Sequence, residues 1–257
     1  MRLLVSVRSA AEVGPALEGG ADIIDAKEPA HGSLGRVSPA TLAEILARVP
    51  PECPFSVALG DLVNPEAAIR AIATLELPAR PGPTYLKLGF AGVRSPEIAT
   101  KTLTMAVAAL ADRGSAALVV AVAYADVQRA ETLQPELITG CAHRAGAAGV
   151  LLDTHTKDGI GLLGWLSPEA RAAWVAGARR KDLFTALAGA LRLEDVDAVA
   201  SAGADVVGVR GAACEGGRQG HVTAHHVGLL RQRLDAFGLY SPAATSYPVT
   251  GGWRNAG

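Results

Sequence analysis

Eight short apolar runs, each followed by a segment with the composition of a helix, recur through the first 235 residues. A segment such as 96–114 begins with Pro and ends with Gly, which is typical of a helix. Eight β–α units in a chain of 257 residues match the number and size of a single (β/α)8 TIM barrel. The expected strands are 3–7, 22–27, 55–61, 85–90, 117–126, 149–154, 183–189 and 205–211.

A doubly wound open sheet is the alternative fold. Its first βα turn usually carries the pattern GxGxxG, whereas the turn at 6–13 reads SVRSAAEV. The repeated pattern stops near residue 236. We therefore expect one barrel domain over 1–235 and an irregular tail over 236–257.

The composition limits the partners and the compartment of the protein. Hydrophobic residues make up 49% of the chain and charged residues 19%, which is ample material for a core. With a net charge of −1, the protein does not have the excess of basic residues that is typical of nucleic-acid binders. The same net charge gives no electrostatic attraction to an anionic membrane surface. No stretch approaches a membrane span, and Cys53, Cys141 and Cys214 fit no zinc spacing. We expect a cytoplasmic protein with reduced thiols that binds neither nucleic acid nor membrane.

Polar side chains collect at the ends of the expected strands, where barrel enzymes carry their chemistry. Lys87 lies between Leu86 and Leu88, so a strand points it away from both and into the barrel. For a single Lys–Asp couple, an ion pair that closes the barrel is an equally good explanation. The number of charges favours a site, because buried ion pairs rarely stabilise a fold. The set comprises Asp25, Lys27, Asp61, Lys87, Tyr124, Asp126, Asp153, Lys157 and Arg210.

A lysine becomes a nucleophile only when its amine is neutral. The ordinary lysine pKa of ~10.4 falls when the side chain is buried or lies beside another cation. Lys27, Lys87 and Lys157 at one rim would lower the pKa of one member of the set. A neutral amine forms a Schiff base with a carbonyl group, and neighbouring carboxylates then move protons. This pattern predicts carbonyl or sugar-phosphate chemistry without a metal.

Glycines near the last two strands predict a phosphate site. Gly208, Arg210 and Gly211 end the eighth strand, and Gly189 follows the seventh. The loops after these strands commonly bind phosphate in (β/α)8 barrels. The histidines at 221, 225 and 226 include an i, i+4 pair, but without an HExxH pattern they do not predict a metal site.

Four segments carry a resemblance to a known family: 3–35, YLKLGF (85–90), LLDTHTKDG (151–159) and DVVGVRGAACEGG (205–217). They resemble (5-formylfuran-3-yl)methyl phosphate synthase of the methanofuran pathway. The resemblance implies a (β/α)8 carbon–oxygen lyase that condenses two molecules of glyceraldehyde 3-phosphate, a small phosphorylated aldehyde, and releases phosphate and water. No cofactor or metal is implied.

The resemblance also implies roles for individual residues. Lys27 resembles the Schiff-base lysine and Lys87 the proton acceptor. Asp25, Asp153 and Lys157 would move protons or bind substrate. Arg210 with Gly189, Gly208 and Gly211 would hold a phosphate, and we add Asp61 and Asp126 at the strand ends as candidate substrate ligands.

Two other functions fit the same residues. One is another Schiff-base aldolase or lyase that acts on a sugar phosphate, and the other is a barrel that binds a phosphorylated ligand without catalysis. The sequence is compatible with a homo-oligomer.

Overall fold

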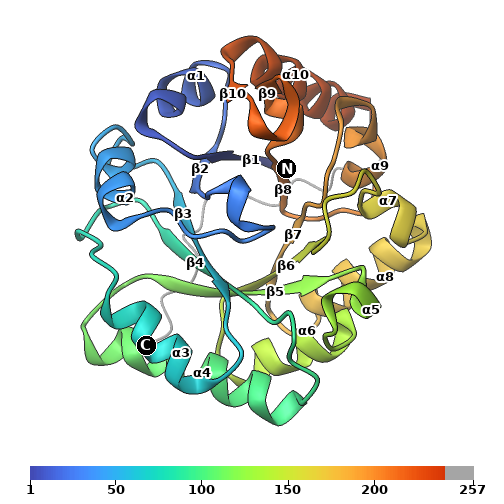
Figure 1. Cartoon of the computed structure of the whole chain (residues 1–257). Helices are drawn as coiled ribbons and strands as arrows, with labels where there is room; N and C mark the ends of the chain where they lie inside the picture. Colours follow the sequence, from blue (N-terminus) through green and yellow to red (C-terminus); the bar gives the residue numbers. More distant parts are fainter. Residues whose placement is uncertain (241–257) are drawn as a thin grey trace.

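The computed structural model describes residues 1–240 and contains a closed barrel of eight parallel strands. Each strand pairs with the next along the chain, and β8 pairs with β1 to close the ring (Figure 1). The (β/α)8 prediction is therefore confirmed. The strands are β1 (Arg2–Val7), β2 (Ile23–Ala26), β3 (Phe55–Asp61), β4 (Thr84–Gly89), β5 (Leu118–Tyr124), β6 (Gly149–Asp153), β7 (Phe184–Leu187) and β8 (Val206–Val209).

Helices surround the barrel, and their starts follow from local sequence. Ser38, Asn64, Ser95 and Ser167 each precede a helix that begins with Pro, and each side chain accepts a hydrogen bond from a backbone N–H of the first turn. The helices are α1 (Val13–Glu18), α2 (Pro39–Leu46), α3 (Pro65–Ala73), α4 (Pro96–Asp112), α5 (Val127–Ala130), α6 (Pro135–Arg144), α7 (Leu162–Trp165), α8 (Pro168–Arg179), α9 (Val196–Ala200) and α10 (Ala224–Tyr240).

The alternation of side chains along each strand divides the molecule into two apolar regions. Leu86 and Leu88 of β4 belong to the large core between the strands and the helices. Tyr85 belongs to the smaller cluster inside the barrel, and Lys87 shares its face of the strand. The predicted inward direction of Lys87 is thus confirmed.

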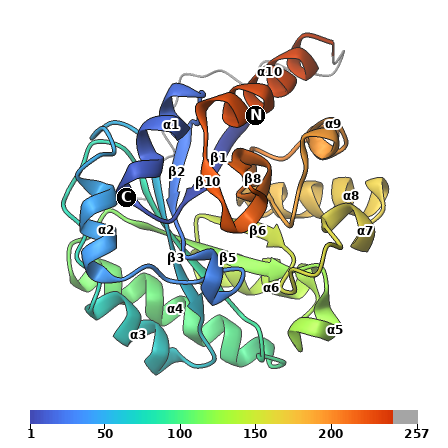
Figure 2. The same cartoon turned by 45° about the horizontal axis from the view of Figure 1, so that its top comes forward.

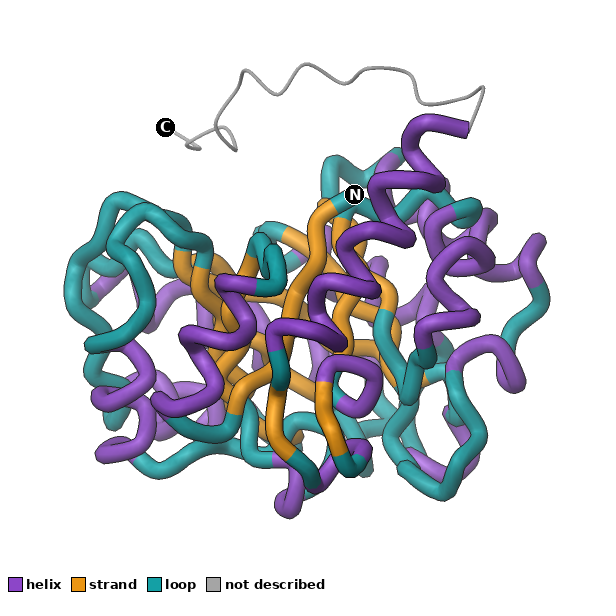
Figure 3. The backbone as a smooth tube through the Cα atoms, turned by 90° about the horizontal axis from the view of Figure 1, so that it is seen from above, coloured by secondary structure: helices purple, strands orange, loops and turns teal. Residues whose placement is uncertain are grey.

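The carboxyl-terminal part of the chain differs from the expectation. Helix α10 runs to Tyr240 and packs against α1 and α9, so the expected domain boundary at 235/236 falls inside a helix (Figure 2). The rest of the expected tail, 241–257, lies outside the described residues. Figure 3 shows α10 beside the strands with the other helices around them.

A small antiparallel hairpin follows β8 and was not predicted. It consists of β9 (Cys214–Glu215) and β10 (His221–Val222), joined by the 3-10 turn η5 (Gly217–Gln219). Its strands of two residues are too short to leave a periodic pattern in the sequence. This hairpin places the segment 216–220 at the carboxyl end of the barrel, beside the loop after β2.

Candidate active site

A cavity of about 480 Å³ lies at the carboxyl ends of the strands. Its volume is in the range of pockets that bind small metabolites. Three lysines line it together with the loops after β7 and β8: Lys27 directly after β2, Lys87 within β4 and Lys157 in the loop after β6. The charged residues of the lining are Lys27, Lys87, Asp153, Lys157, Arg192, Glu194, Arg210 and Arg218.

Asp25 of β2 and Lys87 of β4 form a buried ion pair beside the cavity. The Nζ atom of Lys87 lies 2.7 Å from Oδ2 of Asp25, and Ser6 and Ser56 also donate hydrogen bonds to this carboxylate. Burial by itself raises the pKa of Asp25, but the cations at Lys87 and Lys27 hold it below its usual value. Asp25 is therefore a carboxylate whose acceptor positions are largely occupied.

Asp153 and Lys157 form a second ion pair. Asp153 ends β6, and the Nζ atom of Lys157 lies 2.7 Å from its Oδ1 atom and 3.0 Å from Oγ1 of Thr154. Burial raises the pKa of Asp153, but the ammonium groups of Lys157 and Lys27 bring it below its usual value. The second lysine of the site thus has its own carboxylate.

Lys27 follows β2 directly and is only 7% exposed. Its Nζ atom has no hydrogen-bond or ion-pair partner among residues 1–240, because Asp25 and Asp153 are paired with the other two lysines. Burial, and then repulsion by the nearby Lys87 cation, lower the pKa of Lys27 to about 7. A large fraction of this amine is neutral near neutral pH, as nucleophilic attack requires.

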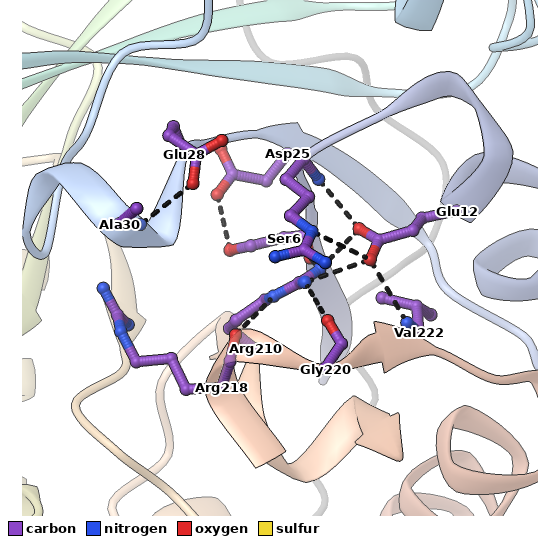
Figure 4. Close-up of polar contacts among 10 residues, drawn as sticks. Ser6, Glu12, Asp25, Glu28, Ala30, Arg210, Arg218, Gly220 and Val222 are labelled. Carbon is purple, nitrogen blue, oxygen red and sulfur yellow. Dashed lines mark hydrogen bonds and ion pairs between the residues drawn. The ribbon is translucent and has the colours of Figure 1, made fainter. Parts of the chain in front are cut away.

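Arg210 lines the cavity as expected, but its hydrogen-bond partners are not the expected ones. Its guanidinium bonds to both carboxylate oxygens of the buried Glu12 and to the backbone carbonyls of Ser6, Arg218 and Gly220 (Figure 4). An arginine has five N–H donors, so this side chain has none left for a phosphate. The expectation that the Arg210 guanidinium holds phosphate is not supported by this geometry. The ion pair of Arg210 with Glu12 instead connects the end of β8 to the segment after β1.

Asp61 and Asp126 are not among the residues that line the cavity. Asp61 accepts hydrogen bonds from the Tyr124 hydroxyl at 2.7 Å and from a backbone N–H. Asp126 accepts the backbone N–H groups of His155 and Thr156, which shapes the loop that carries Lys157. The structure therefore gives both carboxylates a part in positioning loops and does not bring them together with the lysines.

The three predicted glycines do line the cavity: Gly189, Gly208 and Gly211. Gly189 has φ +112°, and a Cβ atom there would lie 3.1 Å from the backbone nitrogen of Thr154, so only glycine fits without strain. Sequence reasoning missed the charged lining residues Arg192, Glu194 and Arg218, and also Glu12, the partner of Arg210. Arg218 stands in the glycine-rich stretch EGGRQG (215–220), which is the one signal that pointed to it.

Among residues 1–240, no three His, Cys, Asp or Glu side chains are close enough to form a metal site. No helix in this range is both long and apolar enough to cross a membrane.

Fold and site together define a lysine-based (β/α)8 barrel protein with its polar groups where barrel enzymes carry their active sites. A family model described as 4-HFC-P synthase matches residues 3–231. The chain therefore belongs to the 4-HFC-P synthase family of enzymes.

Curated relatives agree with this assignment. The (5-formylfuran-3-yl)methyl phosphate synthase of Methanopyrus kandleri is 38% identical over 236 residues, which cover 91% of this chain and 98% of the relative. The enzyme of the same name from Methanothermobacter thermautotrophicus is 36% identical over 239 residues, which cover 92% of this chain and 100% of the relative.

Solved structures are similar in fold alone. Phosphoribosyl anthranilate isomerase from Thermus thermophilus has a TM-score of 0.58 at 16% identity, with 92% of this chain and 99% of that chain covered. A 3-hexulose-6-phosphate synthase has a TM-score of 0.55 at 18% identity, with coverage of 91% and 100%.

Proposed function

We propose that this protein condenses two molecules of glyceraldehyde 3-phosphate into (5-formylfuran-3-yl)methyl phosphate through a Schiff base on Lys27. Membership of the 4-HFC-P synthase family supports the product. The single observation that carries the mechanism is the isolation of Lys27, whose amine lies at the cavity without a carboxylate partner within residues 1–240. Lys87 and Lys157 both have such partners and are poorer nucleophiles for that reason.

The first step is attack of the neutral Lys27 amine on the aldehyde of one triose phosphate. Water leaves, and the protonated Schiff base withdraws electrons from the adjacent carbon. A proton on that carbon becomes acidic, and the Lys87–Asp25 pair accepts it. The second triose phosphate loses its phosphate together with the proton on its middle carbon, which leaves an unsaturated aldehyde. The enamine carbon attacks the terminal carbon of that aldehyde and forms the new carbon–carbon bond.

Later steps release the lysine and make the furan ring aromatic. Over the whole reaction one inorganic phosphate and two molecules of water are lost, and no net oxidation or reduction occurs. This balance makes the enzyme a carbon–oxygen lyase that needs no redox cofactor. We assign the Asp153–Lys157 pair, which lies at the same cavity, to the protonation of departing hydroxyl groups.

The backbone around Gly189 and Gly211 is the proposed cradle for a substrate phosphate. Both glycines line the cavity at the ends of β7 and β8, where backbone N–H groups approach an anion without side-chain obstruction. A cytoplasmic location is part of the same proposal, since all three cysteines are free thiols.

A product assay tests this function. Purified protein is incubated with glyceraldehyde 3-phosphate, and furan absorbance and inorganic phosphate are measured together. The proposal expects the two products in equal amounts and neither with Lys27→Ala. A carbon–carbon bond formed without phosphate release would indicate a different Schiff-base aldolase. Binding without turnover would indicate a phosphate-ligand-binding protein.

A further inference from the structure

Arg218 lies in η5, the turn of the hairpin after β8, and its side chain lines the cavity. Its Nη2 atom donates hydrogen bonds to the carbonyl oxygens of Gly32 at 2.7 Å and Pro29 at 3.2 Å. Both carbonyls belong to the loop that follows Lys27. Figure 4 shows the side chain extended away from Arg210 and toward the segment that carries Ala30. Two loops far apart in the sequence therefore hold this guanidinium in place.

The other cations of the cavity have counter-charges. Lys87 is paired with Asp25, Lys157 with Asp153, and Arg210 with Glu12. The exposed Arg192 lies 3.8 Å from a carboxylate oxygen of Glu194. These pairs leave Lys27 and Arg218 as the cavity cations that form no ion pair within residues 1–240.

Arg218 differs from Lys27 because a guanidinium stays protonated at any physiological pH. Its Nη2 hydrogens are directed at the two carbonyls, while its Nε and Nη1 groups make no hydrogen bond with the described residues. Three N–H donors of a cation that forms no ion pair thus remain available at the cavity. A partly buried cation with unused donors is costly to maintain unless an anion completes it.

The position of Arg218 matches the expected phosphate cradle. A Cβ atom on Gly211 would lie 3.6 Å from the backbone nitrogen of Arg218, so the turn after β8 and the hairpin are in contact. The backbone of the cradle and the free guanidinium therefore belong to one corner of the cavity. Guanidinium groups match the geometry and charge of phosphate better than ammonium groups do.

We propose that Arg218 is the side chain that binds a phosphate group of the substrate, in the role that the sequence suggested for Arg210. The Gly32 and Pro29 carbonyls fix the guanidinium before the ligand arrives, so little side-chain freedom is lost on binding. This inference rests on the proposed function for the identity of the substrate, but phosphate binding itself is tested without turnover.

The test uses inorganic phosphate as the probe and the full chain as the protein. Calorimetric titration compares the wild type with Arg218→Gln and Arg218→Lys, and with Arg233→Gln as the matched control. Arg233 is exposed on α10 and pairs with Asp197. Because Arg218→Gln removes a charged hydrogen bond to the bound phosphate, we expect it to weaken phosphate affinity by about tenfold or more. Arg218→Lys recovers part of the loss, and Arg233→Gln has no effect. An affinity of Arg218→Gln within about twofold of the wild type overturns the proposal.

A second measurement needs no variant. Phenylglyoxal modifies accessible arginines, and mass spectrometry follows the labelling of Arg218 in the wild-type protein. The labelling rate of Arg218 is expected to fall in proportion to the fraction of protein molecules that have phosphate bound. Labelling at an unchanged rate under saturating phosphate contradicts the proposal, even if the substituted proteins fail to fold.

The kinetic readout separates this site from the overall function. With glyceraldehyde 3-phosphate, Arg218→Gln is expected to raise KM by about tenfold or more with a smaller change in kcat. If the protein binds phosphate through Arg218 but forms no furan, the phosphate site is supported and the proposed function is contradicted. If the protein forms furan and Arg218→Gln leaves KM unchanged, the proposed function is supported and the phosphate site at Arg218 is contradicted.

Discussion

The Nζ atom of Lys87 lies 2.7 Å from Oδ2 of Asp25, and neither side chain is more than 4% exposed. Asp25 stands only two residues before Lys27, but its carboxylate is already paired with Lys87. Asp153 is paired with Lys157 in the same way, so the third lysine at the cavity, Lys27, forms no ion pair within residues 1–240. Burial, and then repulsion by the Lys87 cation, lower the pKa of this amine to about 7.

The pH dependence of Schiff-base formation follows from that pKa. The amine reacts only when it is neutral, so the rate of adduct formation should rise about tenfold per pH unit below about 7 and level off above it. The measurement is the initial rate of borohydride-trappable adduct across this range at constant ionic strength. A rate that keeps rising toward the ordinary lysine pKa of ~10.4 would contradict the prediction.

Lys27→Met should abolish turnover and stabilise the fold at low pH. The folded-state pKa of about 7 lies below the value of 10.5 expected when the side chain is in water. Below about 7 both states carry the proton, and the folded state bears the full penalty of a buried cation. The penalty fades as the pH rises toward 10.5, because the unfolded state then binds more protons.

Thermal unfolding checks this prediction. We expect the Tm of Lys27→Met to exceed that of the wild type by several degrees at pH ~6, with a smaller gap at pH ~9. Lys101→Met, on the exposed side of α4, is the matched control and should show no such pH-dependent gap. A lower Tm for Lys27→Met at pH ~6 would show that Lys27 stabilises the fold.

The sequence predicted all eight strands because each contains a short apolar run, and the expected ends lie within two residues of the observed ones. It also predicted the direction of Lys87 from the alternation with Leu86 and Leu88, which the core confirms. It did not predict which lysine pairs with which carboxylate. Asp25 and Lys87 stand on β2 and β4, with β3 between them, so their contact depends on the closure of the barrel.

The contacts of Arg210 were also not predictable from the sequence, because they join residues that are far apart in the chain. Its neighbouring glycines indicated a phosphate ligand, but its partner Glu12 lies 198 residues earlier in the chain. No local pattern connects the two residues. Arg218 was missed because a turn between two strands of two residues has no periodicity.

Replacement of Arg210 should cost stability. Arg210→Met removes the buried partner of Glu12 and leaves, within residues 1–240, only the partly exposed Arg8, 3.9 Å away, as its cation. Breaking a buried pair in this way typically costs about 3–5 kcal/mol. Such a loss lowers the Tm by roughly 10 °C in a chain of this size. The measurement is thermal unfolding of Arg210→Met, Glu12→Leu and the double variant. The double variant should be less destabilised than the sum of the two, and strict additivity would argue against a direct pair.

Tyr124→Phe tests the assignment of Asp61 to loop positioning. Burial and the nearby Asp61 carboxylate raise the pKa of Tyr124 well above its usual value, so its hydroxyl stays a donor. Loss of that hydrogen bond should cost about 1 kcal/mol and lower the Tm by about 2–4 °C. Turnover of glyceraldehyde 3-phosphate should stay within about twofold. A hundredfold loss of kcat with an unchanged Tm would place the Tyr124–Asp61 pair in the reaction itself.

Borohydride trapping tests the role of Lys27 most directly. Wild-type protein is mixed with glyceraldehyde 3-phosphate, reduced with borohydride, digested and examined by mass spectrometry. A reduced triose adduct on Lys27, absent from Lys27→Ala, is the expected result. An adduct on Lys87 or Lys157, or none under conditions that yield furan, would contradict it.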